Sequence, residues 1–387
     1  MIVVFHFLKK MTPDIGGPYS SIENIISATL NKDLIHIVFV EQLSKQSLRS
    51  SNNFEILNAI SMKKKYNEYK NLILINNING SLIKCKVIFH LHGLWTLGNF
   101  IASKFAEKND IPLILSVRGM LYPFALKRNK YIKELAYCLY QKRILKKANV
   151  IHVTSDEEEF TIKNKGFLRT ILIPNIIYKL SECFPISKNN NYPPKKGRKI
   201  IFIGRIHPIK ALDRLISAWQ LLPSYFYHSN ELIIVGNAPD KKYLDKLVCQ
   251  SGGYKNNFAI SFVGPKYSQD KYNILAECDF LILPSYAESF GNSVLEALFY
   301  GLPVIASNGT PWKSLEISGA GWCVSNEVNI LSKVIQEALN LDSIRYNKMS
   351  KSAELLAENF LPSKLKSLYI NMYKSVSKGS HECNIGT

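Results

Sequence analysis

Short runs of apolar, often β-branched residues recur along the chain, and they restrict its fold more than any other feature. In the first half they lie at residues 2–7, 35–40, 72–75, 87–93, 113–119, 150–155 and 171–175. Such nearly continuous apolar runs are typical of parallel strands buried on both faces of a sheet. Segments with helical patterning, such as 98–109 and 129–148, lie between several of them. This alternation predicts a doubly wound α/β domain.

A second series of the same kind follows a polar, proline- and lysine-containing stretch at 187–199. Its apolar runs lie at 199–205, 232–236, 260–264, 279–285 and 303–307. We therefore predict two Rossmann-like domains, residues 1–185 and 186–360. Ligands of open α/β sheets bind beyond the carboxyl ends of the strands, so we expect a shared cleft where the two domains face each other.

Composition limits the partners of the chain. Among 387 residues, 49 Lys and Arg against 30 Asp and Glu give a net charge of +19, which favours an anionic partner. No zinc pattern, helix-turn-helix or aromatic-basic RNA motif accompanies this charge, so we expect no nucleic acid, and a basic nucleic-acid-binding protein stays the non-enzymatic alternative. Seven scattered cysteines without a C-x-x-C pair, and an initial apolar run too short for a signal sequence, predict a cytoplasmic protein.

The most specific motif runs from Glu288 to Glu296, directly after a predicted strand and at the start of an apolar helix. A strand, a glycine turn and a helix N-terminus present unpaired backbone N–H groups, which bind phosphate or sugar oxygens. The spacing lets Glu288 approach the reacting end of a ligand while Glu296 accepts hydrogen bonds from hydroxyls further along it.

Two further loops suit a phosphorylated ligand. Gly204 and Arg205 end the first strand of the second domain, and Lys210 follows five residues later, which suits a diphosphate. In the first domain, Gly16 and Gly17 follow the first strand and can bring backbone N–H groups close to phosphate. The full G-x-G-x-x-G pattern is absent, so a dinucleotide site is not predicted.

Histidines and acidic residues give weaker signals. His90 and His92 alternate along one strand and so lie on the same face. No carboxylate or cysteine stands beside them in the sequence, so we expect no metal there, and we expect His92 to line the acceptor side of the cleft. Ser155 and Glu158 have the spacing of a capping box at a helix N-terminus.

Together these motifs resemble the retaining glycosyltransferases of family 4, which have the GT-B fold, over nearly the whole chain. The resemblance implies that Glu288 contacts the transferred sugar, that Glu296 holds the ribose hydroxyls, and that Arg205 and Lys210 clamp the diphosphate. It implies donor contacts from the remaining motif residues, namely Gly16, Gly17, Ser289, Phe290, Gly291 and Asn292. It also implies metal-independent transfer without a cofactor, the nucleoside-diphosphate-sugar being the donor substrate.

The chain departs from that family at two positions. Many relatives carry a histidine where this chain has Arg118, followed by Gly119-Met120-Leu121, as in a subgroup of bacterial surface-polysaccharide transferases. An arginine cannot act as a base there, but it can bind a donor phosphate or a lipid-diphosphate acceptor, and we count it with Glu288 among the catalytic candidates. Ala211 stands where many relatives have glycine.

These features predict a retaining hexosyl- or related sugar transferase that extends a lipid-linked oligosaccharide in bacterial surface-polysaccharide synthesis (O-antigen, lipopolysaccharide or capsule). Basic residues interleaved with Tyr and Leu between 127 and 147 predict peripheral contact with the anionic inner face of the cytoplasmic membrane. We expect a C-terminal helix and tail, 361–387, to pack back on the N-terminal domain. A nucleotide-sugar epimerase of the same fold is the alternative enzyme.

Overall fold

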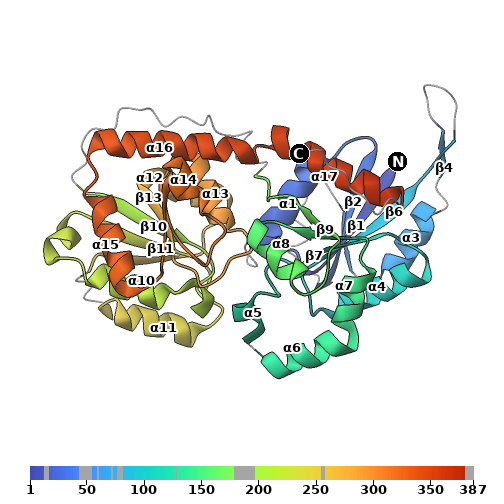
Figure 1. Cartoon of the computed structure of the whole chain (residues 1–387), viewed down its shortest axis with the longest axis horizontal. Helices are drawn as coiled ribbons and strands as arrows, with labels where there is room; N and C mark the ends of the chain where they lie inside the picture. Colours follow the sequence, from blue (N-terminus) through green and yellow to red (C-terminus); the bar gives the residue numbers. More distant parts are fainter. Residues whose placement is uncertain are drawn as a thin grey trace. The chain divides into compact units, whose positions relative to one another are not determined.

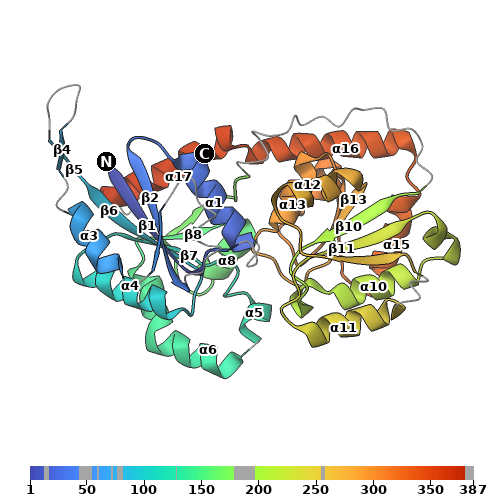
Figure 2. The same cartoon turned by 180° about the vertical axis from the view of Figure 1, so that it is seen from behind.

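The computed structural model describes residues 1–12, 17–42, 55–58, 61–70, 73–75, 82–127, 129–177, 197–253 and 258–379. The chain forms two compact units (Figures 1 and 2). The first comprises Met1–Tyr178 with the C-terminal residues from Pro362, and the second comprises Lys179–Leu361. The sequence prediction puts these boundaries after residues 185 and 360. Each unit has its own parallel sheet, so the predicted α/β class is confirmed.

The first unit contains a seven-stranded parallel sheet with the strand order β3-β2-β1-β6-β7-β8-β9. The strands are β1 (Ile2–Lys10), β2 (Leu34–Gln42), β3 (Glu55–Asn58), β6 (Lys86–His92), β7 (Leu113–Ser116), β8 (Val150–Val153) and β9 (Thr170–Leu172). Most of their residues are buried, as near-continuous apolar runs require when helices cover both faces.

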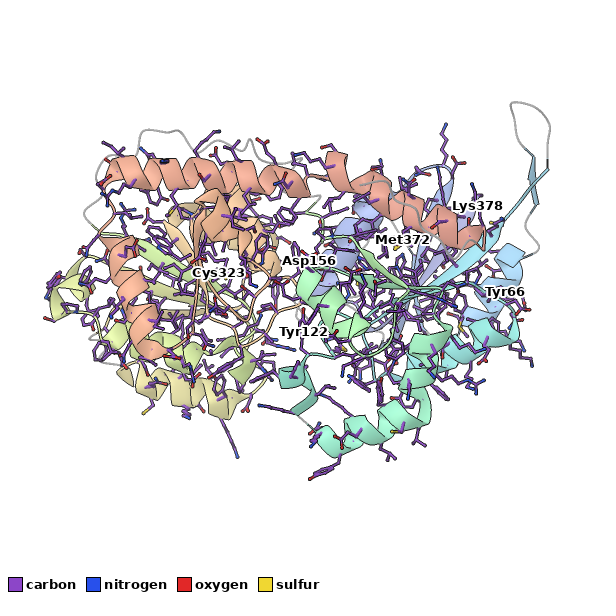
Figure 3. The ribbon with its side chains drawn as sticks, in the orientation of Figure 1. Tyr66, Tyr122, Asp156, Cys323, Met372 and Lys378 are labelled. Carbon is purple, nitrogen blue, oxygen red and sulfur yellow. The ribbon has the colours of Figure 1, made fainter. Side chains whose placement is uncertain are left out.

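Helices cover both faces of this sheet (Figure 1). On one face lie α3 (Met62–Lys70), α4 (Leu97–Lys108) and α7 (Lys142–Lys147), and on the other lie α1 (Gly17–Thr29) and α17 (Pro362–Ser377). Tyr66 of α3 meets Phe105 of α4 edge-on, with ring centroids 5.2 Å apart (Figure 3). Met372 of α17 is fully buried, so the C-terminal helix is part of this unit's core (Figure 3).

The remaining helices among the described residues of the first unit are α5 (Pro123–Lys127), α6 (Lys130–Ala136), the π-helical turn η3 (Tyr137–Gln141) and α8 (Asp156–Lys163). The predicted helix 129–148 is thus α6, η3 and α7 in succession. The predicted capping box is half formed: Ser155 Oγ accepts from Glu158 N at 3.3 Å, but the Glu158 carboxylate accepts from Thr154 N at 2.9 Å.

One predicted strand lies outside the parallel sheet. Residues Ile73–Ile75 (β4) pair antiparallel with Leu82–Lys84 (β5) as a separate two-stranded sheet. The expectation that the run at 72–75 belongs to the parallel sheet is wrong. Antiparallel pairing needs no long crossover connection, so a short strand can pair with the next one along the chain.

The second unit contains a six-stranded parallel sheet with the order β12-β11-β10-β13-β14-β15. Its strands are β10 (Lys199–Ile203), β11 (Glu231–Val235), β12 (Ile260–Gly264), β13 (Phe280–Leu283), β14 (Val304–Ser307) and β15 (Gly321–Val324). Its α-helices are α10 (Leu212–Gln220), α11 (Lys241–Gln250), α12 (Ser268–Glu277), α13 (Asn292–Phe299), α14 (Ser314–Ser318), α15 (Val328–Leu339) and α16 (Ser343–Ala357). Among the helices that the structure describes, none is both long and apolar enough to cross a bilayer.

Candidate functional site

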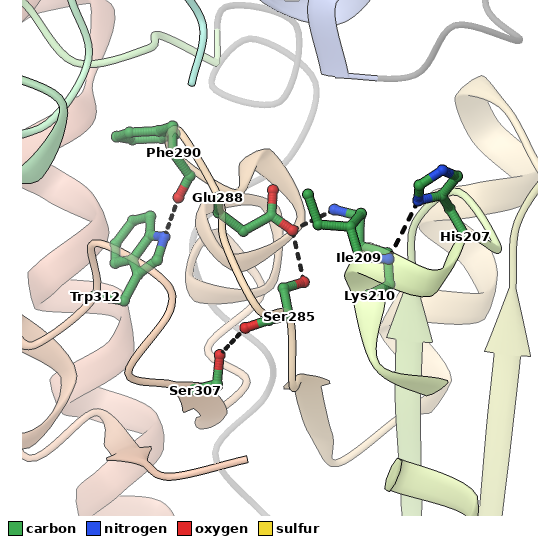
Figure 4. Close-up of polar contacts among 8 residues, drawn as sticks. All are labelled: His207, Ile209, Lys210, Ser285, Glu288, Phe290, Ser307 and Trp312. Carbon is green, nitrogen blue, oxygen red and sulfur yellow. Dashed lines mark hydrogen bonds and ion pairs between the residues drawn. The ribbon is translucent and has the colours of Figure 1, made fainter. Parts of the chain in front are cut away.

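The connection between β13 and α13 in the second unit carries four of the predicted site residues, Glu288, Ser289, Phe290 and Gly291 (Figure 4). Gly291 immediately precedes α13 with φ +88°, a conformation that side chains with a Cβ rarely adopt. A Cβ at this position would lie 3.2 Å from both Leu283 Cδ2 and Trp312 Nε1. Glycine is therefore required here both for the turn and for the close packing that aims the helix N-terminus.

Glu288 lies in this connection and forms an ion pair with Lys210 (Figure 4). Ser285 Oγ donates to Glu288 Oε1 at 2.7 Å, and the Glu288 backbone N–H donates to Gly309 O at 2.9 Å. The side chains of Lys210 and Glu288 are only 15% and 13% exposed. The structure therefore brings together two residues that the sequence analysis assigned to different parts of a donor.

Lys210 belongs to the short 3-10 helix η4 (Pro208–Lys210), which follows β10. His207 Nδ1 accepts from Ile209 N at 3.2 Å, and Ile209 O accepts from Tyr286 N at 2.8 Å, so η4 is joined to the β13–α13 connection. Ala211, at the departure from the family glycine, is buried with φ +52°. A left-handed backbone favours glycine at this position, so alanine adopts it at a cost in backbone strain.

Glu296 projects from the second turn of α13 and is 6% exposed. Its Oε1 accepts from Lys271 Nζ at 2.7 Å, and Lys271 comes from α12. The sequence analysis missed Lys271. This lysine stands seven residues after the ISFVG run and belongs to no recognisable motif. Both carboxylates of the E-x7-E motif are thus paired with a lysine.

The other residues of the motif differ in exposure. Phe290 is 4% exposed and packs on Trp312 with ring centroids 5.2 Å apart, while its carbonyl accepts from Trp312 Nε1 (Figure 4). Ser289 and Asn292 are half-buried. The Phe290 side chain thus packs inside the turn. It is not available to contact a ligand, whereas the backbone of the turn is.

Gly204 and Arg205 follow β10 as predicted. A Cβ on Gly236 would come within 1.8 Å of Gly204 O, so the two loops after β10 and β11 are in backbone contact. Arg205 is exposed. In the first unit, Gly17 begins α1 and is exposed, whereas Gly16 lies outside the described residues.

Arg118 follows β7 with φ +54°, and Gly119 follows it with φ +69°. The Arg118 Nη2 atom lies 3.2 Å from His92 Nδ1, and Glu158 Oε1 accepts from the Gly119 backbone N–H. Glu158 is buried, and this burial raises the pKa of its carboxyl group despite the hydrogen bonds from Thr154 and Gly119. The left-handed turn at Arg118 is thus held from two sides.

His92 is only 5% exposed, and its Nε2 lies 2.9 Å from His6 Nδ1. The ring packs against His90 on the same face of β6, with centroids 4.1 Å apart. Both ring nitrogens of His92 are therefore engaged inside the unit, and its acceptor-side role stays a prediction. His6, His36 and His152, which sequence reasoning missed, lie nearby. One histidine inside each of several apolar runs is the signal that could have revealed them.

Burial governs the charge state of these histidines. It lowers the pKa of His36 to about 3 and that of His152 to about 4, and it lowers the pKa of His6, His90 and His92 well below the usual range. Neighbouring histidines and Arg118 lower the last three further. All five rings are therefore neutral near pH 7.

Comparison with known proteins matches part of the chain to a family and the fold to solved structures. Residues 184–355, most of the second unit, match the model of the family "Glycosyl transferases group 1". Similar solved structures cover nearly the whole chain and show that it has the fold of the GT-B proteins.

Particular relatives are as follows. Anabaena HepE, solved in complex with UDP and glucose, has a TM-score of 0.72 and 16% identity, covering 96% of this chain and 99% of that one. WaaG, a glycosyltransferase involved in lipopolysaccharide biosynthesis, has a TM-score of 0.67 and 17% identity over 99% and 100% of the two chains. The 2-deoxystreptamine N-acetyl-D-glucosaminyltransferase of Niallia circulans is 25% identical over 191 residues, and the match spans 48% of each chain, about half the length of that relative.

Proposed function

We propose that the chain is a retaining glycosyltransferase that uses a nucleoside-diphosphate-sugar as donor. The observation that carries this proposal is the β13–α13 connection, where two carboxylates, each paired with a lysine, flank a glycine turn at a helix N-terminus. The matched family model covers the same residues. The complex of the similarly folded HepE with UDP and glucose supports a nucleotide sugar as ligand.

The proposed reaction forms a bond between an acceptor hydroxyl oxygen and the anomeric carbon and breaks the bond from that carbon to the diphosphate. The hydroxyl proton leaves with the departing phosphate oxygen. Lys210 is shared between Glu288 and the diphosphate, and Arg205 adds a second positive charge, so developing negative charge is stabilised without a metal ion. The first N–H groups of α13 are further donors. Glu288 orients the sugar, and Glu296 binds the ribose.

A thermal-shift panel tests the donor class. UDP-, GDP-, ADP- and dTDP-sugars are added with EDTA to the wild type and to Arg205→Ala. Because a ligand that binds the native state raises its melting temperature, one nucleotide class should stabilise the wild type and not the variant. Stabilisation by none of them, or only without EDTA, counts against the proposed metal-independent donor site.

Product analysis separates transfer from the alternative enzyme. With the stabilising donor and a lipid-linked acceptor fraction, we expect a new glycosidic bond with the anomeric configuration of the donor. Release of free nucleotide with an isomerised sugar would instead indicate an epimerase, and an inverted product would contradict retention.

We also propose that the first unit contacts an anionic membrane at the cytoplasmic inner face, where a lipid-linked oligosaccharide of bacterial surface polysaccharide is extended. Apolar side chains on α6 and η3 are unusually exposed: Tyr131 by 82%, Leu139 by 71% and Ile132 by 70%. Basic residues surround them on the same segment, namely Lys127, Lys130, Lys133, Lys142, Arg143, Lys146 and Lys147. Exposed apolar groups among cations are typical of interfacial helices.

Vesicle flotation tests this contact. The wild type should float with phosphatidylglycerol-containing vesicles and not with pure phosphatidylcholine, and Ile132→Asp should abolish flotation. Ile317→Asp is the matched control, since Ile317 is 87% exposed in the second unit. Equal loss in both variants, or flotation unaffected by Ile132→Asp, would contradict the assignment to α6.

A further inference from the structure

One face of the seven-stranded sheet carries five buried histidines. Even-numbered side chains of β1, β2 and β6 lie on the face that α1 and α17 cover. Odd-numbered side chains, such as Phe5, Phe39 and Phe89, lie on the other face, under α3, α4 and α7. The histidines are His6, His36, His90, His92 and His152. Because a buried imidazole must satisfy both ring nitrogens, the direction of each hydrogen bond follows from the groups at the ends of the chain.

Two series of hydrogen bonds, called the first and second chain below, connect these rings. The first chain runs from Arg118 to helix α1. A guanidinium only donates, so His92 Nδ1 accepts from Arg118 Nη2 at 3.2 Å and His92 Nε2 carries the proton. His92 Nε2–H then donates to His6 Nδ1 at 2.9 Å, and His6 Nε2–H donates to His36 Nδ1 at 2.9 Å.

The first chain closes at Thr29. His36 Nε2–H donates to Thr29 Oγ1 at 3.0 Å, and that hydroxyl donates to Ile25 O at 2.6 Å. Each group between the ends of this series accepts one hydrogen bond and donates the next, so all the bonds run in the same direction, from Arg118 to Ile25 O. This arrangement is complete only when all three rings are neutral and protonated on Nε2.

A second chain shares the same direction and protonation pattern. Tyr373 of α17 donates to His90 Nδ1 at 3.1 Å, and His90 Nε2–H donates to Ser116 Oγ at 2.8 Å. Ser116 Oγ then donates to His152 Nδ1 at 2.8 Å, and His152 Nε2–H donates to Ile173 O at 2.9 Å. This chain fixes His90, which packs directly on His92.

A metal ion is the competing use of these rings, because nitrogens of His6, His90 and His92 lie within 4.8 Å of one another. The hydrogen bonds argue against it. The lone pairs on Nδ1 of the three rings already accept from His92, Tyr373 and Arg118 respectively. A metal ion could use them only after these bonds, including the one to Arg118, are broken.

Arg118 is the group at the open end of the first chain. Its Nε is buried without a hydrogen-bond partner among the described residues, although the residue as a whole is only partly buried. The charged or titratable groups that act on it are Glu158, Tyr369 and Tyr373, besides the histidines. Glu158 meanwhile fixes the backbone at Gly119.

We propose that His92, backed by His6 and His36, is a positioning residue that orients the Arg118 guanidinium for binding phosphate groups of a ligand at the first unit. The inference rests on the proposed function, whose substrates carry phosphate groups. The ring acts through its Nδ1 acceptor, which fixes one guanidinium nitrogen and leaves the Nε–H as the donor for the ligand. His92 itself does not touch the substrate.

Two variants separate positioning from packing. In His92→Asn, the amide oxygen takes the place of Nδ1 and still accepts from Arg118. In His92→Gln, the amide lies near the place of Nε2 and the acceptor beside Arg118 is lost. Each variant replaces the ring with a smaller amide and loses one of its two hydrogen bonds, His92→Asn the one to His6 and His92→Gln the one to Arg118, so a merely structural role would give His92→Asn no advantage in pyrophosphate binding.

The readout is the ¹⁵N spectrum of the full-length protein with labelled histidine and arginine, titrated with inorganic pyrophosphate. The Arg118 Nε–H signal, assigned with Arg118→Lys, should shift on titration in the wild type and in His92→Asn. A hydrogen bond to a charged group corresponds to about a tenfold change in affinity, so His92→Gln should need about tenfold more pyrophosphate. The histidine signals should show neutral Nε2–H rings in the wild type.

Three results would overturn the inference. They are Nδ1–H tautomers at His6, His36 or His92, equal pyrophosphate affinity in His92→Asn and His92→Gln, and broadening of the His6, His90 and His92 signals on addition of Co²⁺. Failure of the proposed function is distinguishable. In that case pyrophosphate still shifts the Arg118 signal with the predicted order of variants, while no sugar nucleotide stabilises the protein.

Discussion

At the scale of single residues, the site in the second unit consists of paired charges rather than isolated acids. Glu288 pairs with Lys210 and Glu296 with Lys271, and all four side chains are at most 16% exposed. Each lysine thus lies beside a carboxylate in a poorly hydrated place. Opposite charges held there gain energy from each other and lose hydration, so removal of one partner costs far more than at the surface.

The Lys271–Glu296 pair gives a stability prediction. Lys271→Met should lower the free energy of unfolding of the second unit by about 2–3 kcal/mol, because it leaves a buried carboxylate unpaired. Adding Glu296→Gln should restore a large part of this loss. Urea denaturation checks both, with Arg345→Met as control, since Arg345 and Asp342 are 78% and 57% exposed. Equal effects of Lys271→Met and Arg345→Met would contradict the prediction.

The two glutamates should differ in kinetics. Glu288→Gln should lower kcat about 100-fold or more with little change in donor KM, because Glu288 orients the reacting sugar in the proposed reaction. Glu296→Gln should raise donor KM about tenfold, because the proposed hydrogen bonds to the ribose are shared by ground state and transition state. Initial rates with the donor found by thermal shift test this division of roles, and the same kinetic defect in both variants would refute it.

At the scale of elements, the turn before α13 depends on glycine for two separable reasons. Gly291 and Gly253 both have positive φ, +88° and +59°, but only Gly291 has atoms within 4 Å of a built Cβ. Gly253→Ala should therefore cost about 1 kcal/mol of stability from backbone strain alone. Gly291→Ala should cost at least about 1 kcal/mol more, since Leu283 and Trp312 must move. Thermal unfolding measures both, and equal costs would show that packing at Gly291 is unimportant.

The β13–α13 element could be predicted from sequence because a strand, a glycine turn and an apolar helix are local features. The pairing of Glu296 with Lys271 could not, because the partners come from different helices and only the order of strands brings α12 beside α13. The prediction that residues 72–75 belong to the parallel sheet was wrong for a related reason. Their apolar pattern is that of a strand, but nothing in the pattern says which strand they pair with.

At the scale of the whole molecule, the two units differ in buried histidines. The first unit buries five, whereas the described histidines of the second, His207 and His228, are half-buried and exposed. Folded-state pKa values below the unfolded value of about 6.5 mean that the unfolded first unit binds more protons in acid. Its stability is therefore full above pH 6.5 and falls as pH drops toward the folded values of about 4 for His152 and about 3 for His36.

Amide hydrogen exchange, corrected for the intrinsic exchange rate at each pH, tests whether the first unit loses stability in acid before the second. Both units are measured in the same sample. Each such histidine should cost the first unit about 1.4 kcal/mol per pH unit in that window, partly offset by Glu158, whose raised pKa acts in the opposite sense. Amides of β1 and β6 should lose protection between pH 7 and 5, while those of β10 and β13 keep theirs. Parallel loss in both sheets would show that the buried histidines do not set the acid response.

The sequence by itself determined the α/β class, the two sheets, and the placing of Glu288, Gly291 and Glu296 around a helix start, because these depend on local periodicity and short spacing. Only the tertiary structure decided which charges pair and what the histidines do. His6, His36 and His92 stand in three separate runs; His6 and His36 each look like a lone polar residue in an apolar strand, and His92 shares its run with His90. Parallel register places them side by side, and burial then favours hydrogen bonds between the rings, from His92 to His6 and from His6 to His36.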